Sequence, residues 1–307
     1  MTSDAGTSHA LDWPKVAVVL VNWNGLHDTL ECLQSLARVS YANLQVIVVD
    51  NASTDGSVAA LRTVKNIHLL ENDWNPGFGA ACNQAAAVAL EMHCDYILFL
   101  NNDTVVDPAF IEPLVSAFQH DRSVAIAESI IYEYRAKDQV ECAGAHFDWR
   151  SGVPYHWHAV KDALPYDIGY ACGCAAMVDA GKWARIGMFD PRFFLYYEDV
   201  DLSLRARALG YRVVAAPQSK VWHKGSASVG FTPRRQYYLR RNLLLLLAKH
   251  ARWTQWPVLL YSFVLRFFLC PLKQYWLTGS PSERERIQMA IAASWDFCRG
   301  RFGKFRD

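Results

Sequence analysis

Four short apolar runs alternate with helix-like stretches in the first third of the chain. The runs are rich in Val, Ile and Leu and lack polar alternation; they lie at 16–21, 46–50, 67–70 and 96–100. Such runs are typical of parallel strands buried on both faces. The stretches between them show helical spacing or are rich in alanine, at 26–39, 57–64 and 78–92. The alternation predicts a doubly wound α/β sheet, with ligands bound beyond the carboxyl ends of its strands.

The pattern becomes mixed after a helix start expected at Asp107-Pro108. We expect strands at 124–131, 169–179 and 211–216, and a helix at 202–209 that ends at Gly210. Residues 132–168 hold aromatic and turn residues without a clear period. They predict irregular hairpins or a loop.

Two apolar runs follow residue 233, at 243–247 and 257–270. Arg266 interrupts the second run, and Pro257 and Pro271 bracket it. A bilayer span needs about 20 apolar residues, so this run is too short to cross and instead indicates an amphipathic helix in the membrane interface. The alternative is a helical hairpin packed on the core or forming a dimer. Arginines at the start of this region either hold phosphates or form a solvated helix face; they are Arg234, Arg235, Arg240 and Arg241.

Composition and charge limit the classes of protein to which the chain can belong. Hydrophobic residues make up 52% of the 307 and charged residues 20%, which excludes a disordered chain. The net charge is +1, but residues 231–307 hold 14 Lys/Arg against 4 Asp/Glu. This basic, Trp-rich tail indicates an anionic partner. The N-terminus shows no signal-peptide pattern, and eight cysteines without a CxxC pair predict buried thiols in a reducing cytosol.

Polar, glycine-containing turns follow the first three runs. They read Asn22-Trp23-Asn24-Gly25, then Asp50-Asn51-Ala52-Ser53-Thr54-Asp55-Gly56, then Asn75-Pro76-Gly77-Phe78. A carboxylate at a strand tip, such as Asp50, accepts hydrogen bonds from a ribose or a base N–H, and a glycine turn at a helix N-terminus suits a phosphate. Ordinary turn and capping chemistry, with Asp55 or Ser53 as the cap, explains each turn equally well in isolation.

The fourth run ends in Asn101-Asn102-Asp103. Mg²⁺ and Mn²⁺ favour oxygen ligands, and a diphosphate supplies several, so one protein carboxylate is sufficient. We predict Asp103 as a metal ligand; the alternative is a turn-forming aspartate.

Three carboxylates crowd into four positions at a helix start: Glu198, Asp199 and Asp201. Mutual repulsion raises a pKa, which is useful in a general base. The structural alternative is that Asp199 caps the helix and Asp201 complements its dipole. His223 follows a strand and either completes a metal shell or is structural.

In this order, seven segments resemble glycosyltransferase family 2, most closely its rhamnosyltransferase-like branch. They span about residues 16–242 and read VVLVNWNG, VVDNASTDGS, NPGFGAACNQA, LFLNNDT, ACGCAAMV, GMFDPRFFLYYEDVDL and VWHKGSAS. The resemblance implies a GT-A fold, an inverting mechanism and a divalent metal, Mn²⁺ or Mg²⁺. The D-x-D motif of the family reads Asn101-Asn102-Asp103 here, which removes one carboxylate and implies modest metal affinity.

The resemblance also implies roles for individual residues. Asp50 matches the acidic residue that reads the nucleotide base. Asp103 matches the last aspartate of the metal motif, and His223 a position that approaches the metal in several relatives. Asp199 matches the catalytic base, with Glu198 beside it. The remaining expected contacts to the nucleotide sugar are Asn22, Asn24, Asn51, Asp55, Asn75, Gly77, Phe78 and Asn102.

The family implies a definite organisation and function. We expect a flexible N-terminus (1–14), a GT-A catalytic domain (15–232) with a nucleotide-binding half to about 105 and an acceptor-binding half after it, and a basic amphipathic helical region (233–307). The donor is a dTDP-, UDP- or GDP-linked sugar, with rhamnose the first choice. The acceptor is a hydroxyl of a glycan or polyprenyl-linked glycan in cell-surface polysaccharide synthesis. We expect a cytoplasmic protein, peripheral on the inner face of the cell membrane, with no nucleic-acid partner.

Three other classes of protein fit less well. A dehydrogenase needs G-x-G-x-x-G after the first strand, where Asn22-Trp23-Asn24-Gly25 stands. A sugar-phosphate nucleotidyltransferase needs a glycine-rich basic loop at the same place. A non-catalytic sugar-nucleotide-binding or scaffold protein has no need of Glu198-Asp199.

Overall fold

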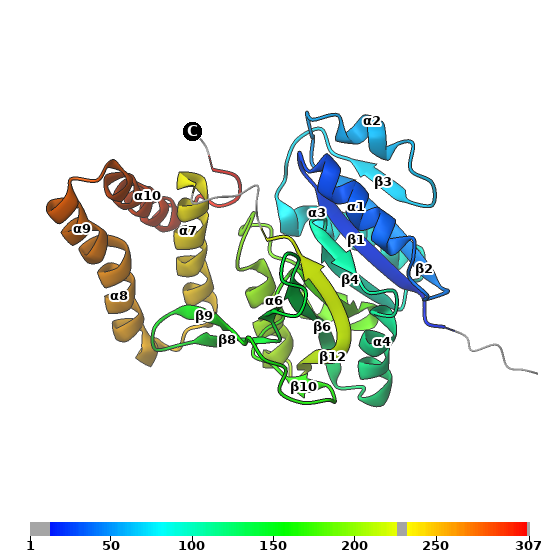
Figure 1. Ribbon diagram of the computed structural model, residues 1–307. Helices are drawn as coiled ribbons and strands as arrows, with labels where there is room; N and C mark the ends of the chain where they lie inside the picture. The colour runs from blue at the N-terminus through cyan, green and yellow to red at the C-terminus, as the bar shows by residue number, and fades with distance from the viewer. Residues whose placement is uncertain (1–12, 226–231, 306–307) are drawn as a thin grey trace, which may run out of the picture.

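The side chains of strand β1 (Val16–Asn22) alternate between two apolar cores, one on each face of the sheet. Ala17 and Val19 join the core under helix α3 (Phe78–Glu91), whereas Val18 and Leu20 join the core under α1 (Leu26–Leu36). Burial on both faces explains the absence of polar alternation in this run. The computed structural model describes residues 13–225 and 232–305 and confirms the predicted doubly wound sheet (Figure 1).

The first half of the sheet is parallel. Strand β1 lies between β2 (Leu44–Asp50) and β4 (Tyr96–Asn101), and β3 (His68–Glu71) adds to β2 at the edge. Helix α2 (Ser57–Leu61) connects β2 to β3 and packs on the same side as α1. Because the strands are parallel, their carboxyl ends and the polar turns that follow them lie along one edge.

The second half continues the same sheet with strands in both directions. The order is β10-β12-β6-β11-β4-β1-β2-β3, and β11 is antiparallel to both β4 and β6. The elements of this half are β5 (Thr104–Val106), α4 (Ile111–His120), β6 (Val124–Glu133), β7 (Val140–Cys142), β10 (Tyr166–Asp167), β11 (Ala175–Asp179), α5 (Ala180–Ile186), α6 (Glu198–Ala208) and β12 (Arg212–His223). The predicted hairpins in 132–168 include the separate ribbon of β8 (Ala145–Asp148) and β9 (Val153–His156).

The structure corrects three expected boundaries. Strand β11 begins at Ala175 rather than at 169, because the preceding residues turn to meet other segments: Gly169 N–H donates to Ala145 and Gly173 N–H to Asp199. Helix α6 begins at Glu198, four residues earlier than expected. Strand β12 continues to His223, because its second half pairs with both β5 and β6.

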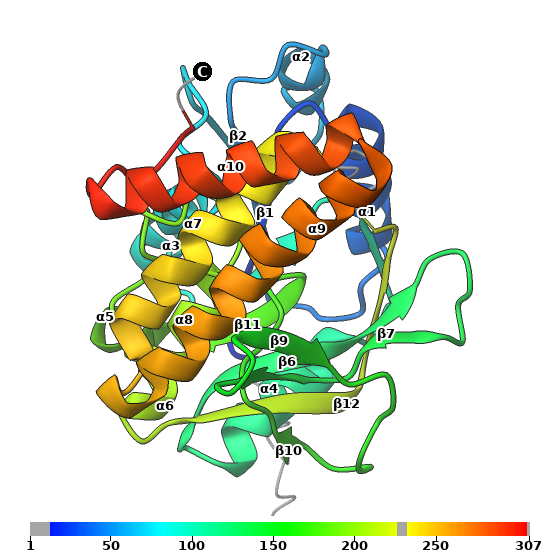
Figure 2. The same cartoon turned by 90° about the vertical axis from the view of Figure 1, so that its left-hand side faces the viewer.

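In the described residues 232–305, a group of helices follows the sheet and gathers on one side of the molecule (Figure 2). Helix α7 (Pro233–His250) packs against the sheet domain, and α10 (Pro281–Cys298) packs on α7. Between them, α8 (Trp256–Val264), a π-helical turn η2 (Leu265–Leu269) and α9 (Cys270–Thr278) follow one another. With the short turn η1 (Trp253–Gln255) they form a 26-residue helix, Trp253–Thr278, which is long and apolar enough to cross a membrane by length and composition.

This continuous helix overturns the expectation that Pro271 limits the apolar run. A proline inside a regular α-helix clashes with the carbonyl four residues earlier. Here the N–H of Cys270 donates to Leu265 O, five residues back, so the backbone is widened just before the proline. The helix therefore passes through Pro271, and the prediction that the run is too short is wrong.

Candidate active site

The turns after β1, β2 and β4 are joined by a buried network of amides and one carboxylate. Asn22 and Asp50 are fully buried, and Asn22 Nδ2 donates to Asp50 Oδ2 at 2.6 Å. Asn22 Oδ1 accepts from Asn102 Nδ2 at 3.3 Å, and the second Asp50 oxygen accepts from the Ser53 N–H at 2.8 Å. A Cβ on Gly25 would lie 2.8 Å from Asn102 Nδ2, so only glycine leaves room for this contact. Asn22 therefore links all three turns, and Asp50 joins the first two.

A second set of bonds ties the first two turns at their exposed side. Asn24 N–H donates to Ser53 Oγ at 2.9 Å, and Asn24 Oδ1 accepts from the Thr54 N–H at 2.7 Å. Asp55 accepts from the N–H of Ser57 at 3.0 Å and from the N–H of Leu26 at 3.1 Å. Asp55 thus bonds to the first turns of both α1 and α2, which makes these turns one unit.

The turn between β3 and α3 contacts the segment that precedes α6. Asn75 Oδ1 accepts from the Gly77 N–H at 2.8 Å, and Asn51, on the neighbouring strand end, lies beside both residues. Gly77 has φ +95°, and a Cβ there would lie 2.5 Å from Phe194 O. The Phe78 N–H donates to that same carbonyl at 2.8 Å. Glycine at 77 therefore permits direct contact between the start of α3 and the loop before Glu198-Asp199.

Asp103 and His223 meet where β4 ends and β12 ends. His223 Nε2 lies 3.3 Å from Asp103 Oδ1, and Nδ1 lies 3.0 Å from both oxygens of Glu141. Burial lowers the pKa of His223, but the hydrogen bonds to the two carboxylates outweigh it and raise that pKa to about 10. The ring is therefore fixed between two anions.

The pair Asp103 and His223 fits a divalent cation by the spacing of its donor atoms. Adjacent ligands in an octahedral shell with bonds of about 2.1 Å lie about 3 Å apart, close to the 3.3 Å between Nε2 and Oδ1. Metal-binding histidines commonly donate their other ring N–H to a carboxylate, as His223 does to Glu141.

A second group of potential ligands lies on α1, formed by His27, Asp28 and Glu31. Here the ammonium of Lys224 already donates to both carboxylates, at 2.6 Å each. A metal would have to displace this whole ammonium group at the α1 site, whereas at the Asp103 pair it would have to displace only a proton of the His223 ring.

Asp199 lies at the same edge of the sheet as Asp103. The N–H of Asn101, two residues before Asp103, donates to Cys174 O at 2.8 Å. The adjoining Gly173 N–H donates to Asp199 Oδ2, also at 2.8 Å. A short path of backbone bonds therefore connects the end of β4 to the carboxylate of Asp199.

Burial raises the pKa of both carboxyl groups at the start of α6. For Asp199, desolvation outweighs the hydrogen bonds from the Gly173 and Val200 N–H groups. For Glu198, burial and the charge of Asp199 raise the pKa from 4.5 to about 8. Glu198 Oε2 is buried without a hydrogen-bond partner among the described residues. A carboxyl group with a raised pKa accepts a proton more readily, as a general base requires.

The raised pKa of Glu198 predicts a pH-dependent stability. Between about pH 4.5 and 8 the folded protein keeps a proton that the unfolded chain has released, so the free energy of unfolding falls as pH rises through this window. Over the same window, we expect the free energy of unfolding of Glu198→Gln to fall less than that of wild type. The two losses should differ by on the order of 1–3 kcal/mol. Urea unfolding at about pH 5 and about pH 8 measures it. Equal losses in wild type and variant would contradict the burial argument.

The loop before Asp199 has a strained backbone that α7 holds in place. Phe194, Tyr196 and Tyr197 all have positive φ, between 63° and 72°, an unfavourable region for such side chains. Asn242 Nδ2, fully buried, donates to three carbonyls of this loop, those of Phe193, Leu195 and Tyr196, at 2.7–3.0 Å. The strained conformation is thus fixed by one side chain of α7.

Arg241 also bonds to this loop, and we call Asn242 and Arg241 together the clasp. Arg241 Nη2 donates to Arg192 O at 3.2 Å and to Phe193 O at 3.1 Å, and the exposed fraction of Arg241 is 1%. Arg240 is also fully buried, so this part of α7 is not a solvated face. The alternative of a solvated helix face is wrong for these residues, and the backbone contacts of Arg241 and Asn242 were not predicted.

Removing the clasp should loosen the loop. Asn242→Ala leaves buried carbonyls without a donor, and we expect the free energy of unfolding to fall by roughly 2–3 kcal/mol. Urea unfolding measures the loss. Gln288→Ala, an exposed amide on α10, is the control and should change stability little. If both variants unfolded at the wild-type urea concentration, the clasp would be energetically irrelevant.

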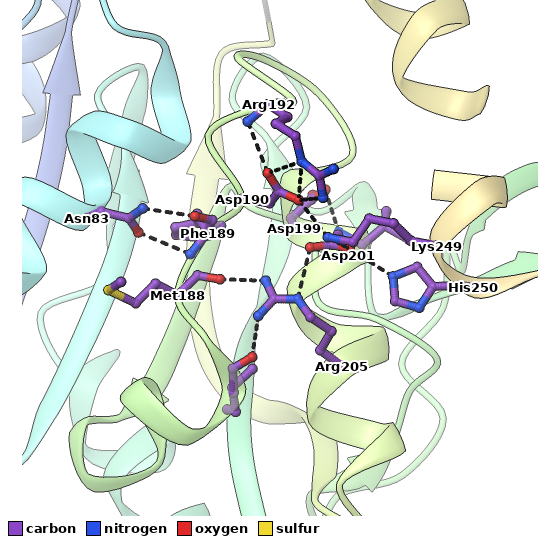
Figure 3. Close-up of polar contacts among 12 residues, drawn as sticks. Asn83, Met188, Phe189, Asp190, Arg192, Asp199, Asp201, Arg205, Lys249 and His250 are labelled. Carbon is purple, nitrogen blue, oxygen red and sulfur yellow. Dashed lines mark hydrogen bonds and ion pairs between the residues drawn. The ribbon is translucent and has the colours of Figure 1, made fainter. Parts of the chain in front are cut away.

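Ion pairs attach the end of α7 to α6, as Figure 3 shows. The buried carboxylate of Asp201 accepts from Arg205 Nε at 2.9 Å and lies 2.7 Å from both Lys249 Nζ and His250 Nε2. These partners lower the pKa of Asp201 despite its burial. Lys249 also reaches Asp190 at 2.7 Å. Asp201 therefore has a structural role, as the structural alternative for this carboxylate predicted. Its ion pairs with α7 were not part of that prediction.

Sequence reasoning missed Glu141 and Gly173. Both contact a predicted residue, His223 and Asp199 respectively. Gly173 lies inside the ACGCAAMV segment, which does not indicate a contact with Asp199, and Glu141 stands next to no recognisable motif. Glu141 belongs to the segment without a clear period. Pairing across the sheet, which brings these residues in, carries no local signal in the sequence.

The chain is similar in sequence to known glycosyltransferases. Residues 17–181, more than half of the chain, match the family model Glycosyl transferase family 2. A relative from Mycobacterium tuberculosis, N-acetylglucosaminyl-diphospho-decaprenol L-rhamnosyltransferase, is 26% identical over 251 residues, which cover 74% of this chain and 82% of the relative. The dTDP-rhamnosyl transferase RfbF of Shigella flexneri is 25% identical, covering 76% and 80%.

Solved structures share the fold. GalNAc-T7 with UDP, GalNAc and Mn²⁺ superposes with a TM-score of 0.63 at 14% identity, over 94% of this chain and 56% of that chain. The mannosyltransferase PcManGT from Pyrobaculum calidifontis, with GDP-Man and Mn²⁺, superposes with a TM-score of 0.57 at 17% identity, over 94% and 88%. The GT-A fold expected from the sequence is confirmed.

Proposed function

Because the chain belongs to glycosyl transferase family 2 and is a glycosyltransferase, we propose that it transfers rhamnose from a dTDP-linked donor to a hydroxyl of a polyprenyl-linked glycan. The observation that carries this proposal is the short path from Asp103 and His223 to Asp199 across the Cys174 and Gly173 contacts. A site for a diphosphate and a site for a proton acceptor at one sheet edge are what a sugar transfer requires.

Asp103 and His223 are proposed to hold a divalent cation, with Glu141 orienting the histidine. When bound, the cation neutralises the charge that develops on the leaving diphosphate. Its identity is proposed as Mn²⁺ or Mg²⁺ from the oxygen and imidazole donors. Two related folds carry Mn²⁺ in their solved structures.

Asp199 is proposed as the general base. Its carboxylate takes the proton of the acceptor hydroxyl while that oxygen attacks the anomeric carbon, and the nucleoside diphosphate leaves from the opposite side. This single displacement inverts the anomeric centre. The raised pKa of Asp199 and its fixed orientation on the Gly173 and Val200 N–H groups support the role.

The polar turns at the ends of β1, β2 and β3 are proposed as the nucleotide-sugar site. Asp50 and Asn22 belong to the base-reading part, where Asp50 also holds the turns together. Asn75, Gly77 and Phe78 belong to the ribose and diphosphate part, because they follow β3 at the edge where the parallel strands end. Asn24, Asn51, Asp55 and Asn102 complete the proposed set.

The donor and acceptor are inferred from the printed names of the relatives. One relative is named for dTDP-rhamnose, and another for L-rhamnose and a diphospho-decaprenol carrier. The basic C-terminal region supports an acceptor on an anionic lipid. We place the reaction in cell-surface polysaccharide synthesis, on the cytoplasmic face of the cell membrane.

Membrane contact is proposed through the outer face of the Trp253–Thr278 helix. Trp253 is 83% exposed and Trp276 79%, whereas Leu259 and Phe263 on the other side are buried in the protein. A helix that packs on the protein through a few side chains of one face and exposes the rest is suited to lie in the interface rather than to cross the bilayer. Exposed tryptophans at both ends suit the headgroup region.

Glutamine at both Trp253 and Trp276 should weaken binding to phospholipid vesicles at least about tenfold, since each indole would otherwise leave water. Co-sedimentation measures the binding. Trp74→Gln removes a 63% exposed tryptophan far from this helix and is the control. Equal binding by the double variant and wild type would count against the membrane face.

A donor panel followed by a transfer assay tests the proposed function. Thermal shifts with dTDP, UDP and GDP in the presence of Mn²⁺ identify the nucleotide, and dTDP is expected to give the largest shift. Release of dTDP from dTDP-rhamnose should then depend on a polyprenyl-diphosphate-linked glycan. Binding of dTDP-rhamnose without acceptor-dependent release would indicate a non-catalytic binding protein, and a larger shift with UDP or GDP would reassign the donor.

A further inference from the structure

Arg266 stands in the middle of the apolar Trp253–Thr278 helix without a charged partner. Its guanidinium reaches Ser151 O only at 3.5 Å, the limit of a hydrogen bond. Within residues 13–225 and 232–305, no carboxylate forms an ion pair with it. A half-buried cation among apolar side chains is costly unless an anion compensates it.

The Arg266 side chain borders a hollow of about 350 Å³ between this helix and α10. Small-molecule sites begin at about this size. Polar side chains line it from both helices, and the apolar Leu265 lies at its border; the polar ones are Ser262, Arg266, Gln274, Glu283 and Arg286. Leu265, Cys270 and Pro271 supply its apolar lining, so the hollow combines apolar walls with a group of polar side chains.

A third arginine lies behind the wall of this hollow. Arg240 on α7 is fully buried, donates from Nη1 to Arg286 O at 2.5 Å, and lies over the Phe267 ring at 5.1 Å. Its Nε and Nη2 have no hydrogen-bond partner among the described residues. Burial and the charge of Arg286 lower the pKa of Arg240 to about 10 although Glu283 opposes this, which shows how poorly this charge is compensated.

The balance of charge around the hollow is positive. Glu283 accepts from Arg286 Nη1 at 2.8 Å and so compensates one of the three arginines. Arg240 and Arg266 remain without a carboxylate partner among the described residues. Guanidinium groups bind phosphate oxygens through paired N–H donors. Arg266, at the border of the hollow, is therefore complementary to a phosphate group, and the buried Arg240 adds positive charge from behind the wall.

The position of the hollow indicates where such a phosphate comes from. Exposed apolar side chains of the same helix flank it, among them Leu265, Leu269 and Leu272 at 38%, 50% and 43% exposure. On the inner side, Phe263 and Phe267 of the same helix pack in one apolar cluster with Tyr197, two residues before Asp199. The hollow thus lies between an apolar surface and the base loop.

We propose that the hollow between η2, α9 and α10 binds the phosphate group of a membrane lipid whose apolar chain lies along the exposed face of the Trp253–Thr278 helix. That this lipid is the polyprenyl-linked acceptor rests on the proposed function. The site then binds the diphosphate of the carrier, while the attached sugar extends toward Asp199.

Vesicle binding by the full chain, without donor nucleotide, tests this site. Phosphatidylcholine vesicles carry either polyprenyl diphosphate or an equal charge of phosphatidylglycerol. We expect wild type to bind the polyprenyl diphosphate vesicles more tightly than the phosphatidylglycerol vesicles. In Arg266→Gln the ratio of the two affinities should fall about tenfold. The matched control is Lys273→Gln, which removes an exposed charge from the same helix outside the hollow and should keep the preference.

Each outcome decides the proposal. Loss of the preference in Arg266→Gln alone supports it. Equal loss in both variants would reduce the effect to surface charge, and no preference in wild type would remove the site. Inorganic pyrophosphate that binds as tightly as the lipid would overturn the lipid assignment. Because no sugar transfer is measured, a failed transferase assay leaves this test unaffected.

Discussion

Asp199→Asn should abolish sugar transfer, with kcat reduced by about 10²–10⁴-fold, while nucleotide binding is retained. The amide keeps the shape of the side chain and an oxygen for the Gly173 N–H, but it cannot accept the proton of the acceptor hydroxyl. Transfer rates at saturating donor and acceptor, with calorimetric titration of the nucleotide, separate the two effects.

The control for this substitution is Asp138→Asn, an exposed aspartate in the turn before β7, which should turn over normally. Normal turnover by Asp199→Asn would show that another group takes the proton. Glu198, buried beside it with a raised pKa, would then be the first residue to test.

Asp103→Ala should remove the metal-dependent part of nucleotide binding, which we expect to weaken about a hundredfold. The substitution leaves His223 as a single protein donor in the proposed metal site. The metal shell has no second carboxylate to compensate, because Asn101 replaces the first aspartate of the D-x-D motif of the family. Titration of a nucleoside diphosphate with and without Mn²⁺ measures the effect.

Asp28→Asn is the matched control for this experiment. It alters the group formed by His27, Asp28 and Glu31, which offers three close ligand atoms elsewhere at this end of the molecule. The Mn²⁺ enhancement should survive in Asp28→Asn and disappear in Asp103→Ala. The opposite pattern would move the metal to α1.

The first half of the fold was predictable because its signals are local. Each buried strand is an unbroken apolar run, and each ends in a polar turn, so the positions of Asn22, Asp50 and Asp103 along one edge follow from parallel pairing. The second half depends on antiparallel pairing between distant segments, such as β11 between β4 and β6. Such pairing leaves no period in the sequence, which is why Glu141 and Gly173 were missed.

The C-terminal region shows how packing overrides local patterns. Arg240, Arg241 and Asn242 look like a solvated face by composition, yet all three are buried because α7 fills the space beside the base loop. Pro271 predicts a helix end, but the π-helical turn before it lets the helix continue through the proline. The cysteine prediction holds for five buried thiols, whereas Cys172 is half-buried and Cys270 and Cys298 are exposed.

Locating the metal in a crystal with Mn²⁺ and a nucleoside diphosphate tests the central claim most directly. The anomalous signal of Mn²⁺ should lie within bonding distance of Asp103 and His223, in contact with the diphosphate, on the side of the sheet edge that Asp199 faces. A metal bound at His27, Asp28 and Glu31, or a diphosphate turned away from Asp199, would contradict the account.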